Sequence, residues 1–243
     1  MVPVSGPRPA LALDRVCLDL GTQVVFREAS LSVATGETVA IVGAVGTGKS
    51  SVIRLGCGAE PPASGRVQSL GIDPADRIES VAGRLGVLFQ THGLLATMTV
   101  RENLALPLIY HDRVPQDALE DTLLEAMAVA RLHADELDSR PAVMSGGELR
   151  RAALARAWLT GWELLLLDDL LRGREFDDVA AFRAFQERVQ ARCPAAIVLS
   201  TQDVTLAAEI ADRIVAVVDH DLVELDRTLP LGELSALALG ITP

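Results

Sequence analysis

An apolar run that leads directly into a glycine-rich loop constrains this chain more than any other feature. The run is Glu37–Val42, and the loop that follows it, GAVGTGKS, is Gly43–Ser50. The glycines can take backbone conformations that other residues avoid, so that successive N–H groups turn towards one anion. Helical spacing follows over Lys49–Leu55, and the dipole of a helix N-terminus attracts the same anion. The strand, loop and helix together predict a phosphate-binding loop in an α/β domain.

The loop and a later strand also supply groups that suit a nucleotide and its metal ion. Lys49 would reach the β- and γ-phosphates, and Ser50 would give its hydroxyl to Mg²⁺. Leu164–Leu167 reads as a buried strand that delivers the carboxylate of Asp168 to that ion. A core strand that ends at a solvated acidic pair is the plain alternative. The loop residues expected to contact the nucleotide are Gly43, Ala44, Val45, Gly46, Thr47, Gly48, Lys49, Ser50 and Ser51.

A second glycine pair opens a helix in the middle of the chain. The segment MSGGE occupies Met144–Glu148, where Ser145, Gly146 and Gly147 would present a hydroxyl and free N–H groups to an anion. A chain that already has one phosphate loop does not need a second for the same nucleotide. We therefore expect this segment to serve the nucleotide of a facing subunit. A capping box between Ser145 and Glu148 is the plain alternative, and both roles are compatible.

Strands and helices alternate along the rest of the chain, which favours a mostly parallel sheet covered by helices. We expect strands at 86–90, 164–167 and 195–200, and helices at 100–106, 116–130, 146–158, 177–191 and 205–211. We expect an antiparallel patch over 11–33, with turns at 21–22 and 27–28, and a hairpin of 214–218 with 222–225. The predicted single domain 1–243 divides into a core at 11–90 and 159–225, a helical subdomain at 91–158 and a short tail at 226–243.

Composition limits the classes of partner. The formal net charge of -11 argues against nucleic acid and against an anionic membrane surface as electrostatic partners. Hydrophobic residues make up 49% of the chain and aromatic residues 3%, so the core is built from aliphatic side chains. The three cysteines have no paired spacing, as in a reduced cytosolic chain. We find no signal-peptide pattern and no apolar run long enough to cross a bilayer.

The three motifs, in this order and at these spacings, resemble those of the nucleotide-binding subunit of an ATP-binding cassette (ABC) transporter, over roughly Val16–Val218. The resemblance implies an α/β fold of the P-loop NTPase type, with a RecA-like core, an N-terminal antiparallel β patch and an inserted helical subdomain. It implies ATP and Mg²⁺ as cofactors and an ATPase that closes as a head-to-tail dimer.

The resemblance also assigns roles to single residues. Gln90 sits where the family has a glutamine that senses the metal ion and couples to the membrane subunit. Ser50, Gln90 and Asp168 would be the metal ligands. Ser145, Gly146 and Gly147 match the signature that touches the γ-phosphate across the dimer. The positions implied to take part in hydrolysis are Asp169, Gln202 and Gln90.

The resemblance further implies partners and a location. These partners are transmembrane permease subunits, a second ATP-binding subunit that is either the same chain or a different one, and a periplasmic or membrane-anchored substrate-binding component. The chain would lie in the cytoplasm, peripheral on the inner face of the plasma membrane. The apolar segment Leu94–Leu108 is where the permease would dock.

Three positions depart from the family pattern. Asp169 replaces the glutamate that polarises the attacking water, Gln202 replaces a switch histidine, and Leu20 replaces an aromatic residue that stacks on adenine. Loss of one transition-state donor costs roughly 10²–10³ in rate in comparable sites. These changes favour a protein that binds Mg-ATP but hydrolyses it slowly. The alternative is a degenerate or regulatory subunit with negligible turnover.

A narrower resemblance concerns the substrate. The segments LFQTHGLLATMTVRENLALPL and SGGELRRAALARA, together with Gly173, are similar to the ATPases of bacterial phospholipid-trafficking (Mla-type, MCE-associated) transporters. ATPases of lipoprotein-release systems are the rival family. A soluble cassette acting on ribosomes or DNA would need a second cassette or a long coiled insertion, and this sequence contains neither.

Overall fold

The computed structural model describes residues 8–76, 80, 83–89, 93–110, 114–169 and 179–241, with the backbone alone at 179–181. The strands are β1 Leu11–Leu20, β2 Gln23–Val33, β3 Thr38–Val42, β4 Ser64–Ser69, β5 Leu85–Leu88, β6 Leu164–Asp168, β7 Ala196–Thr201, β8 Arg213–Val218 and β9 Asp221–Leu225. The helices are α1 Lys49–Gly56, α2 Val100–Tyr110, α3 Leu119–Ala130, α4 Gly146–Thr160, α5 Val179–Arg192, α6 Val204–Ile210 and α7 Leu231–Ala238. Short 3-10 helices occupy Gln116–Ala118, Ala134–Glu136 and Pro141–Val143.

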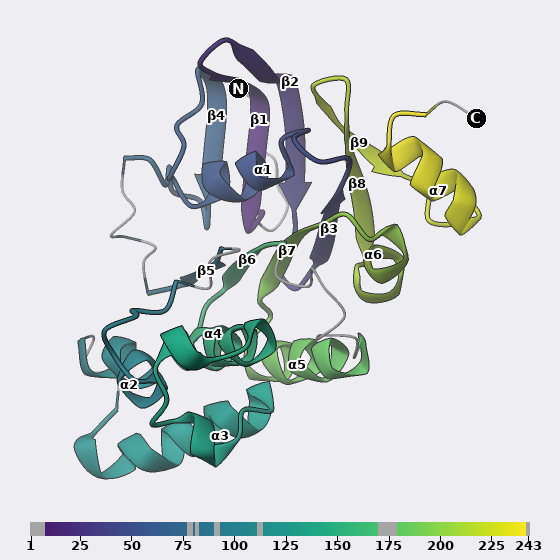
Figure 1. Cartoon of the computed structure of the whole chain (residues 1–243). Coiled ribbons are helices and arrows are strands. Elements are labelled where there is room, and N and C mark those ends of the chain that lie inside the picture. Colours follow the sequence, from purple (N-terminus) through teal and green to yellow (C-terminus); the bar gives the residue numbers. More distant parts are fainter. Residues whose placement is uncertain are drawn as a thin grey trace.

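A six-stranded sheet of order β5-β6-β7-β3-β8-β9 forms the centre of the molecule (Figure 1). Its strands pair in parallel except for β9, which runs antiparallel to β8. Every residue of β3, β6 and β7 is buried, as expected of parallel strands covered on both faces. This sheet confirms the predicted fold class, and its register places the carboxyl ends of β3, β6 and β7 side by side.

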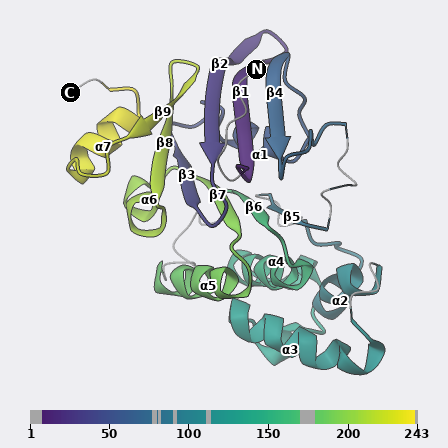
Figure 2. The same cartoon turned by 180° about the vertical axis from the view of Figure 1, so that it is seen from behind.

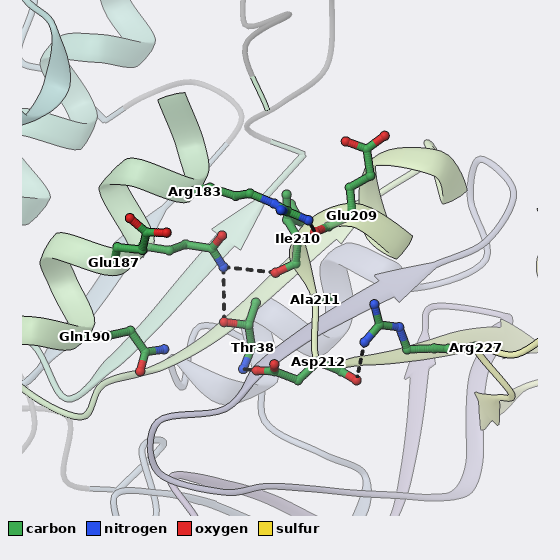
Figure 3. Close-up of a pocket in the computed structure, with 10 residues that line it drawn as sticks. Thr38, Arg183, Glu187, Gln190, Glu209, Ile210, Ala211, Asp212 and Arg227 are labelled. Atoms are coloured by element: carbon green, nitrogen blue, oxygen red, sulfur yellow. Dashed lines mark hydrogen bonds between the residues drawn. The ribbon is translucent and has the colours of Figure 1, made fainter. Parts of the chain in front are cut away.

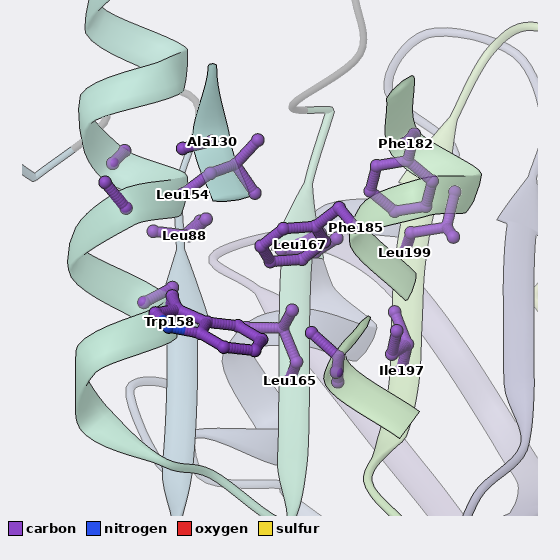
Figure 4. Packing of buried hydrophobic residues seen from close by; sticks show 14 of the residues in the cluster. Leu88, Ala130, Leu154, Trp158, Leu165, Leu167, Phe182, Phe185, Ile197 and Leu199 are labelled. Atoms are coloured by element: carbon purple, nitrogen blue, oxygen red, sulfur yellow. The ribbon is translucent and has the colours of Figure 1, made fainter. Parts of the chain in front are cut away.

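The two faces of the central sheet bury separate hydrophobic clusters. Leu165 and Leu167 of β6 belong to the cluster that contains α4 and α5, while Leu164 and Leu166 belong to the cluster that contains α1 and β1. Figures 1 and 2 show α4 and α5 on one side of the sheet, and α1 on the other side together with a three-stranded antiparallel sheet of order β2-β1-β4. Figure 4 shows the side chain of Trp158 from α4 packed beside the strand residues.

Helices α2, α3 and α4 pack against one another at one end of the molecule (Figure 1). Asn103 of α2 is fully buried, and its amide Nδ2 donates to the carbonyls of Leu95, Met98 and Thr99. These bonds fix the chain just before the helix. The division of the domain into a core and a helical subdomain at 91–158 stays a prediction. Within the residues that the structure describes, no helix combines the length and the apolar character that a membrane crossing requires.

The predicted turn at 27–28 is wrong. Both residues lie inside β2, where Glu28 has a φ of 54° and its N–H donates to Cys17 Sγ at 3.4 Å. The pairing of β1 with β2 shifts register at several points, so this feature is a bulge. A bulge uses the same left-handed conformation as a tight turn, and the polar residues at 27–28 signal either one.

Three further elements differ from the sequence prediction. β4 was not predicted, because its half-exposed pattern lacks an apolar run. No helix or strand was predicted within the short tail at 226–243, which contains α7, packed on α6 and β8. α2 continues beyond 106 through Pro107, since burial of Leu104 and Leu108 on the same helix holds the segment in place.

We predict that Gly65→Ala destabilises the fold much more than Gly21→Ala. Both glycines have positive φ, at +89° and +62°, but a Cβ at Gly65 would lie 2.2 Å from the Arg15 carbonyl oxygen, whereas Gly21 has nothing within 4 Å. The left-handed conformation alone costs about 1–2 kcal/mol. Urea unfolding should show a loss of that size for Gly21→Ala and at least about 3 kcal/mol for Gly65→Ala. Equal losses would show that β4 adjusts to relieve the collision.

Candidate functional site

The loop between β3 and α1 has the conformation that the sequence predicts for it. Gly43, Gly46 and Gly48 have φ values of 151°, 80° and 111°. A Cβ at Gly48 would lie 2.5 Å from Val25 Cγ1, so β2 packs directly against the loop. A Cβ at Gly43 would lie 2.9 Å from Thr47 Oγ1. Conformation therefore favours glycine at all three positions, and space favours it at Gly43 and Gly48.

The ammonium group of Lys49 is held inside the curve of this loop. Its Nζ donates to the carbonyls of Gly43 at 2.9 Å and Ala44 at 2.6 Å, and the residue is buried. Thr47 Oγ1 donates to the same Ala44 carbonyl at 3.0 Å. A positive charge thus sits at the N-terminal end of α1, where the helix dipole also favours an anion.

A hydroxyl–carboxylate cluster joins the start of α1 to the ends of two central strands. Asp168, the last residue of β6, is buried, and its Oδ1 accepts from Ser50 Oγ and from Ser200 Oγ, each at 2.8 Å. Ser50 lies in the first turn of α1, and Ser200 lies next to last in β7. The structure therefore brings the two predicted metal ligands Ser50 and Asp168 together.

Ser200 is a site residue that the sequence analysis missed. Its hydroxyl also accepts the backbone N–H of Asp169 at 2.9 Å, and Asp169 has a φ of 49°. The sequence carries no specific signal for this role, because it does not give the register of the strands. Parallel strands finish at the same edge, and the register pairs Asp168 directly with Ser200.

The donor set fits Mg²⁺, which is the ion that the resemblance implies. Ser50 and Asp168 offer hard oxygen ligands, and Mg²⁺ is usually held by one or two carboxylates with phosphate and water oxygens. Across the described part of the chain, no cluster of three His, Cys, Asp or Glu side chains offers an all-protein cage. Gln90, the third predicted ligand, lies outside the described residues, as does Gly173.

The segment MSGGE forms the start of α4 with a complete capping box. Ser145 Oγ accepts the Glu148 N–H at 3.3 Å, and Glu148 Oε2 accepts the Ser145 N–H at 2.6 Å. This hydrogen bond from the Ser145 backbone holds the pKa of Glu148 below its usual value. Ser145 and Gly146 are exposed, and Gly147 is buried. The capping role is therefore present, and the first turn of α4 stays open on one side.

The remaining predicted residues lie at exposed positions near element ends. Leu20 ends β1 and is 41% exposed. Gln202 is exposed and follows β7 directly, and the next residue, Asp203, caps α6 by accepting the Leu206 N–H at 3.0 Å. Gln202 therefore stands beside Ser200 and Thr201 in sequence, at the carboxyl edge that carries Asp168.

A polar pocket at the opposite end of β3 is explained by the capping of α6 (Figure 3). Three side chains donate to the last carbonyls of that helix: Arg227 to Ala208 at 2.7 Å, Gln186 to Ile210 at 3.1 Å, and Arg183 to Glu209. Its polar groups serve the fold, so the pocket is not the nucleotide site.

Comparison with known proteins identifies the family. A family model described as ABC transporter matches residues 26–172, more than half of the chain. The methionine import ATP-binding protein MetN 2 of Paraburkholderia xenovorans is 34% identical over 202 residues, which cover 80% of this chain and 51% of that protein. The sulfate/thiosulfate import ATP-binding protein CysA of Synechococcus elongatus is 34% identical, with coverages of 88% and 61%. The chain thus spans about half to two thirds of the length of these curated relatives.

Solved structures share the fold. The ATP-binding cassette MJ0796, described as a dimer in a post-hydrolysis state bound to ADP and Pi, gives a TM-score of 0.77 at 23% identity and covers 89% of this chain and 98% of its own. A structure described as the ATP binding subunit of an ABC transporter gives 0.80 at 24% identity, with coverages of 94% and 99%.

The relatives named here handle methionine and sulfate or thiosulfate, so the narrower resemblance to phospholipid-trafficking ATPases stays a prediction. The motifs, the fold and the family match agree on the nucleotide and the ion, which are ATP and Mg²⁺. The chain belongs to the ATP-binding domains of the ABC transporter family.

Proposed function

We propose that this chain hydrolyses Mg-ATP in a head-to-tail dimer and so drives a membrane permease. The observation that carries the proposal is the contact of Ser50 and Asp168 beside the buried ammonium of Lys49. The phosphate loop, the two proposed metal ligands and the end of β6, which leads to Asp169, all lie at one edge of the sheet. A domain built only for structural contacts would not need to bury a lysine and an aspartate there.

Each residue has a distinct task in this mechanism. The loop N–H groups and Lys49 bind the β- and γ-phosphates and offset their charge. Ser50 and Asp168 would hold Mg²⁺, which would neutralise charge on the phosphates. The carboxylate of Asp169 accepts a hydrogen bond from the attacking water, and the side-chain amide of Gln202 donates to the γ-phosphate. Water then displaces ADP from the γ-phosphorus, leaving inorganic phosphate.

Two of the three departures from the family pattern support slow turnover. Asp169 is one methylene shorter than glutamate, and a displacement of about 1 Å can cost on the order of 10²-fold in rate. Gln202 can donate but cannot carry a charge. A regulatory or degenerate subunit with negligible turnover is the second candidate, and these same two residues favour it.

The separation of the two anion-binding segments supports a dimer. The phosphate loop continues into α1 on one face of the sheet, whereas Ser145–Gly147 open α4, which packs on the other face. Figure 1 shows the two helices on different sides of the sheet. A second subunit, identical or different, would bring its own signature to this loop. The cassette MJ0796 is described as dimeric.

Exposed apolar side chains around α2 support the contact with a permease. Leu95, Leu106, Ile109 and Tyr110 are 44%, 38%, 65% and 80% exposed. They lie within or directly after the predicted docking segment Leu94–Leu108. We place the chain on the cytoplasmic face of the inner membrane, with a periplasmic or membrane-anchored component that binds the substrate. Phospholipid is the proposed substrate class, and lipoprotein release is the alternative.

We predict that Lys49→Ala abolishes ATP turnover and that Asp169→Glu raises it by about 10- to 100-fold, because glutamate restores the reach to the attacking water. The measurement is phosphate release by the chain co-purified with its permease partner. Asp169→Asn is the control for side-chain size and should abolish turnover, since an amide is a poor acceptor for the proton of the attacking water. If wild type binds ATP tightly but Asp169→Glu still shows no turnover, the regulatory subunit is the better interpretation.

We predict that Ile109→Asp lowers co-purification with the permease by about tenfold, since it would place an unpaired charge in an apolar contact. Leu231→Asp is the matched control, because Leu231 is 47% exposed on α7, well away from α2 in Figure 1. ATP binding by both isolated variants should equal that of wild type. Equal loss of the permease in the two variants would contradict a docking surface on α2.

A further inference from the structure

Ser200 is one of two buried hydroxyl residues that follow the apolar run of β7. β7 has the sequence AIVLST, all six of its residues are buried, and Ser200 is 3% exposed. A hydroxyl removed from water is costly unless it is hydrogen-bonded. Ser200 therefore needs partners, and their identity decides whether it serves packing or the site.

Both partners of Ser200 are consecutive site residues. Its Oγ donates to Asp168 Oδ1 at 2.8 Å and accepts from the backbone N–H of Asp169 at 2.9 Å. The hydroxyl thus uses its single proton and one of its lone pairs in hydrogen bonds to these two neighbouring residues. Ser50 donates to the same oxygen, so Asp168 Oδ1 accepts one hydrogen bond from α1 and one from β7.

The contact with Asp169 acts on the backbone. Asp169 has a φ of 49°, a left-handed conformation that costs roughly 1–2 kcal/mol in a non-glycine residue. The hydrogen bond from its N–H to Ser200 holds this turn directly after the strand. Because an aspartate side chain has only two rotatable bonds, the direction of its carboxylate follows from the backbone turn. A shortened carboxylate therefore depends on Ser200 more than a longer one would.

We propose that Ser200 is a positioning residue for both carboxylates of the site, orienting Asp168 for the metal ion and fixing the turn that directs Asp169. This inference rests on the proposed ATPase function and names a residue that neither the motifs nor the comparisons assign. Ser200 does not touch the nucleotide; it acts through its two neighbours.

The test compares a pair of variants that differ only in the hydroxyl. Ser200→Thr keeps the oxygen and Ser200→Val replaces it with a methyl group of the same shape, so the pair separates hydrogen bonding from volume. Partners that orient metal ligands typically change metal affinity or activity 10- to 100-fold when removed. We expect Ser200→Val to lower kcat about tenfold and to raise the Mg²⁺ concentration for half-maximal AMP-PNP binding severalfold, while Ser200→Thr stays near wild type.

Two readouts distinguish positioning from a structural role. AMP-PNP affinity in EDTA should change less than about twofold in either variant, because Lys49 and the loop are intact. Ser69→Ala is the matched control: Ser69 is fully buried and its Oγ donates to the Gly56 carbonyl at 2.5 Å, away from both carboxylates. It should leave kcat and the Mg²⁺ dependence unchanged. The increase in kcat caused by Asp169→Glu should be at least about threefold smaller when Ser200 is also replaced by valine, because residues in contact do not act independently.

The outcomes separate this inference from the proposed function. If the wild-type protein shows no ATP turnover, the ATPase proposal is wrong. The Mg²⁺ dependence of AMP-PNP binding would still test the role of Ser200. Equal kcat and equal Mg²⁺ dependence in Ser200→Thr and Ser200→Val would overturn the positioning role. So would a loss of nucleotide affinity in EDTA for Ser200→Val, because that result would mean a general disturbance of the loop.

Discussion

The parallel pairing of β3, β7 and β6 inside a sheet covered on both faces is the constraint on which the site depends. Register along these strands puts Asp168 opposite Ser200 and Val42 opposite Thr201. The phosphate loop leaves β3 at the same edge at which the two carboxylates leave β6. Residues separated by more than a hundred positions thus meet through backbone hydrogen bonds alone, and the Ser50–Asp168 contact then ties α1 to that edge.

Most of the fold follows from local patterns because the core strands contain long apolar runs and a glycine-rich loop follows β3. The strand at 164–167 and the helix at 146–158 are found in β6 and α4. What could not be predicted involves weak or ambiguous signals. β4 is an edge strand whose first three residues are exposed, and the bulge at Glu28 has the same polar, left-handed character as a turn.

The candidate site, like the fold, contains residues that the sequence predicts and residues that it does not. Lys49, Ser50, Asp168 and the capping box at Ser145 were predictable, because each belongs to a motif whose chemistry requires those residue types. Ser200 was not, since a serine near the end of an apolar strand resembles an ordinary strand terminus. Only the three-dimensional register shows that its hydroxyl faces Asp168 and the turn at Asp169. Long-range partners of this kind leave no periodic trace in the sequence.

The capping of α6 has a consequence for Gln202. Asp203 closes the N-terminal end of this helix, and Arg183, Gln186 and Arg227 bind its last carbonyls from two separate segments. A short helix that is held by side-chain hydrogen bonds at both ends can shift only as a rigid body. Gln202, one residue before the cap, therefore has little freedom beyond rotation about its own side-chain bonds. The distance between its amide and the phosphate loop is set by the framework, so it can vary only if the whole strand-and-helix unit is displaced.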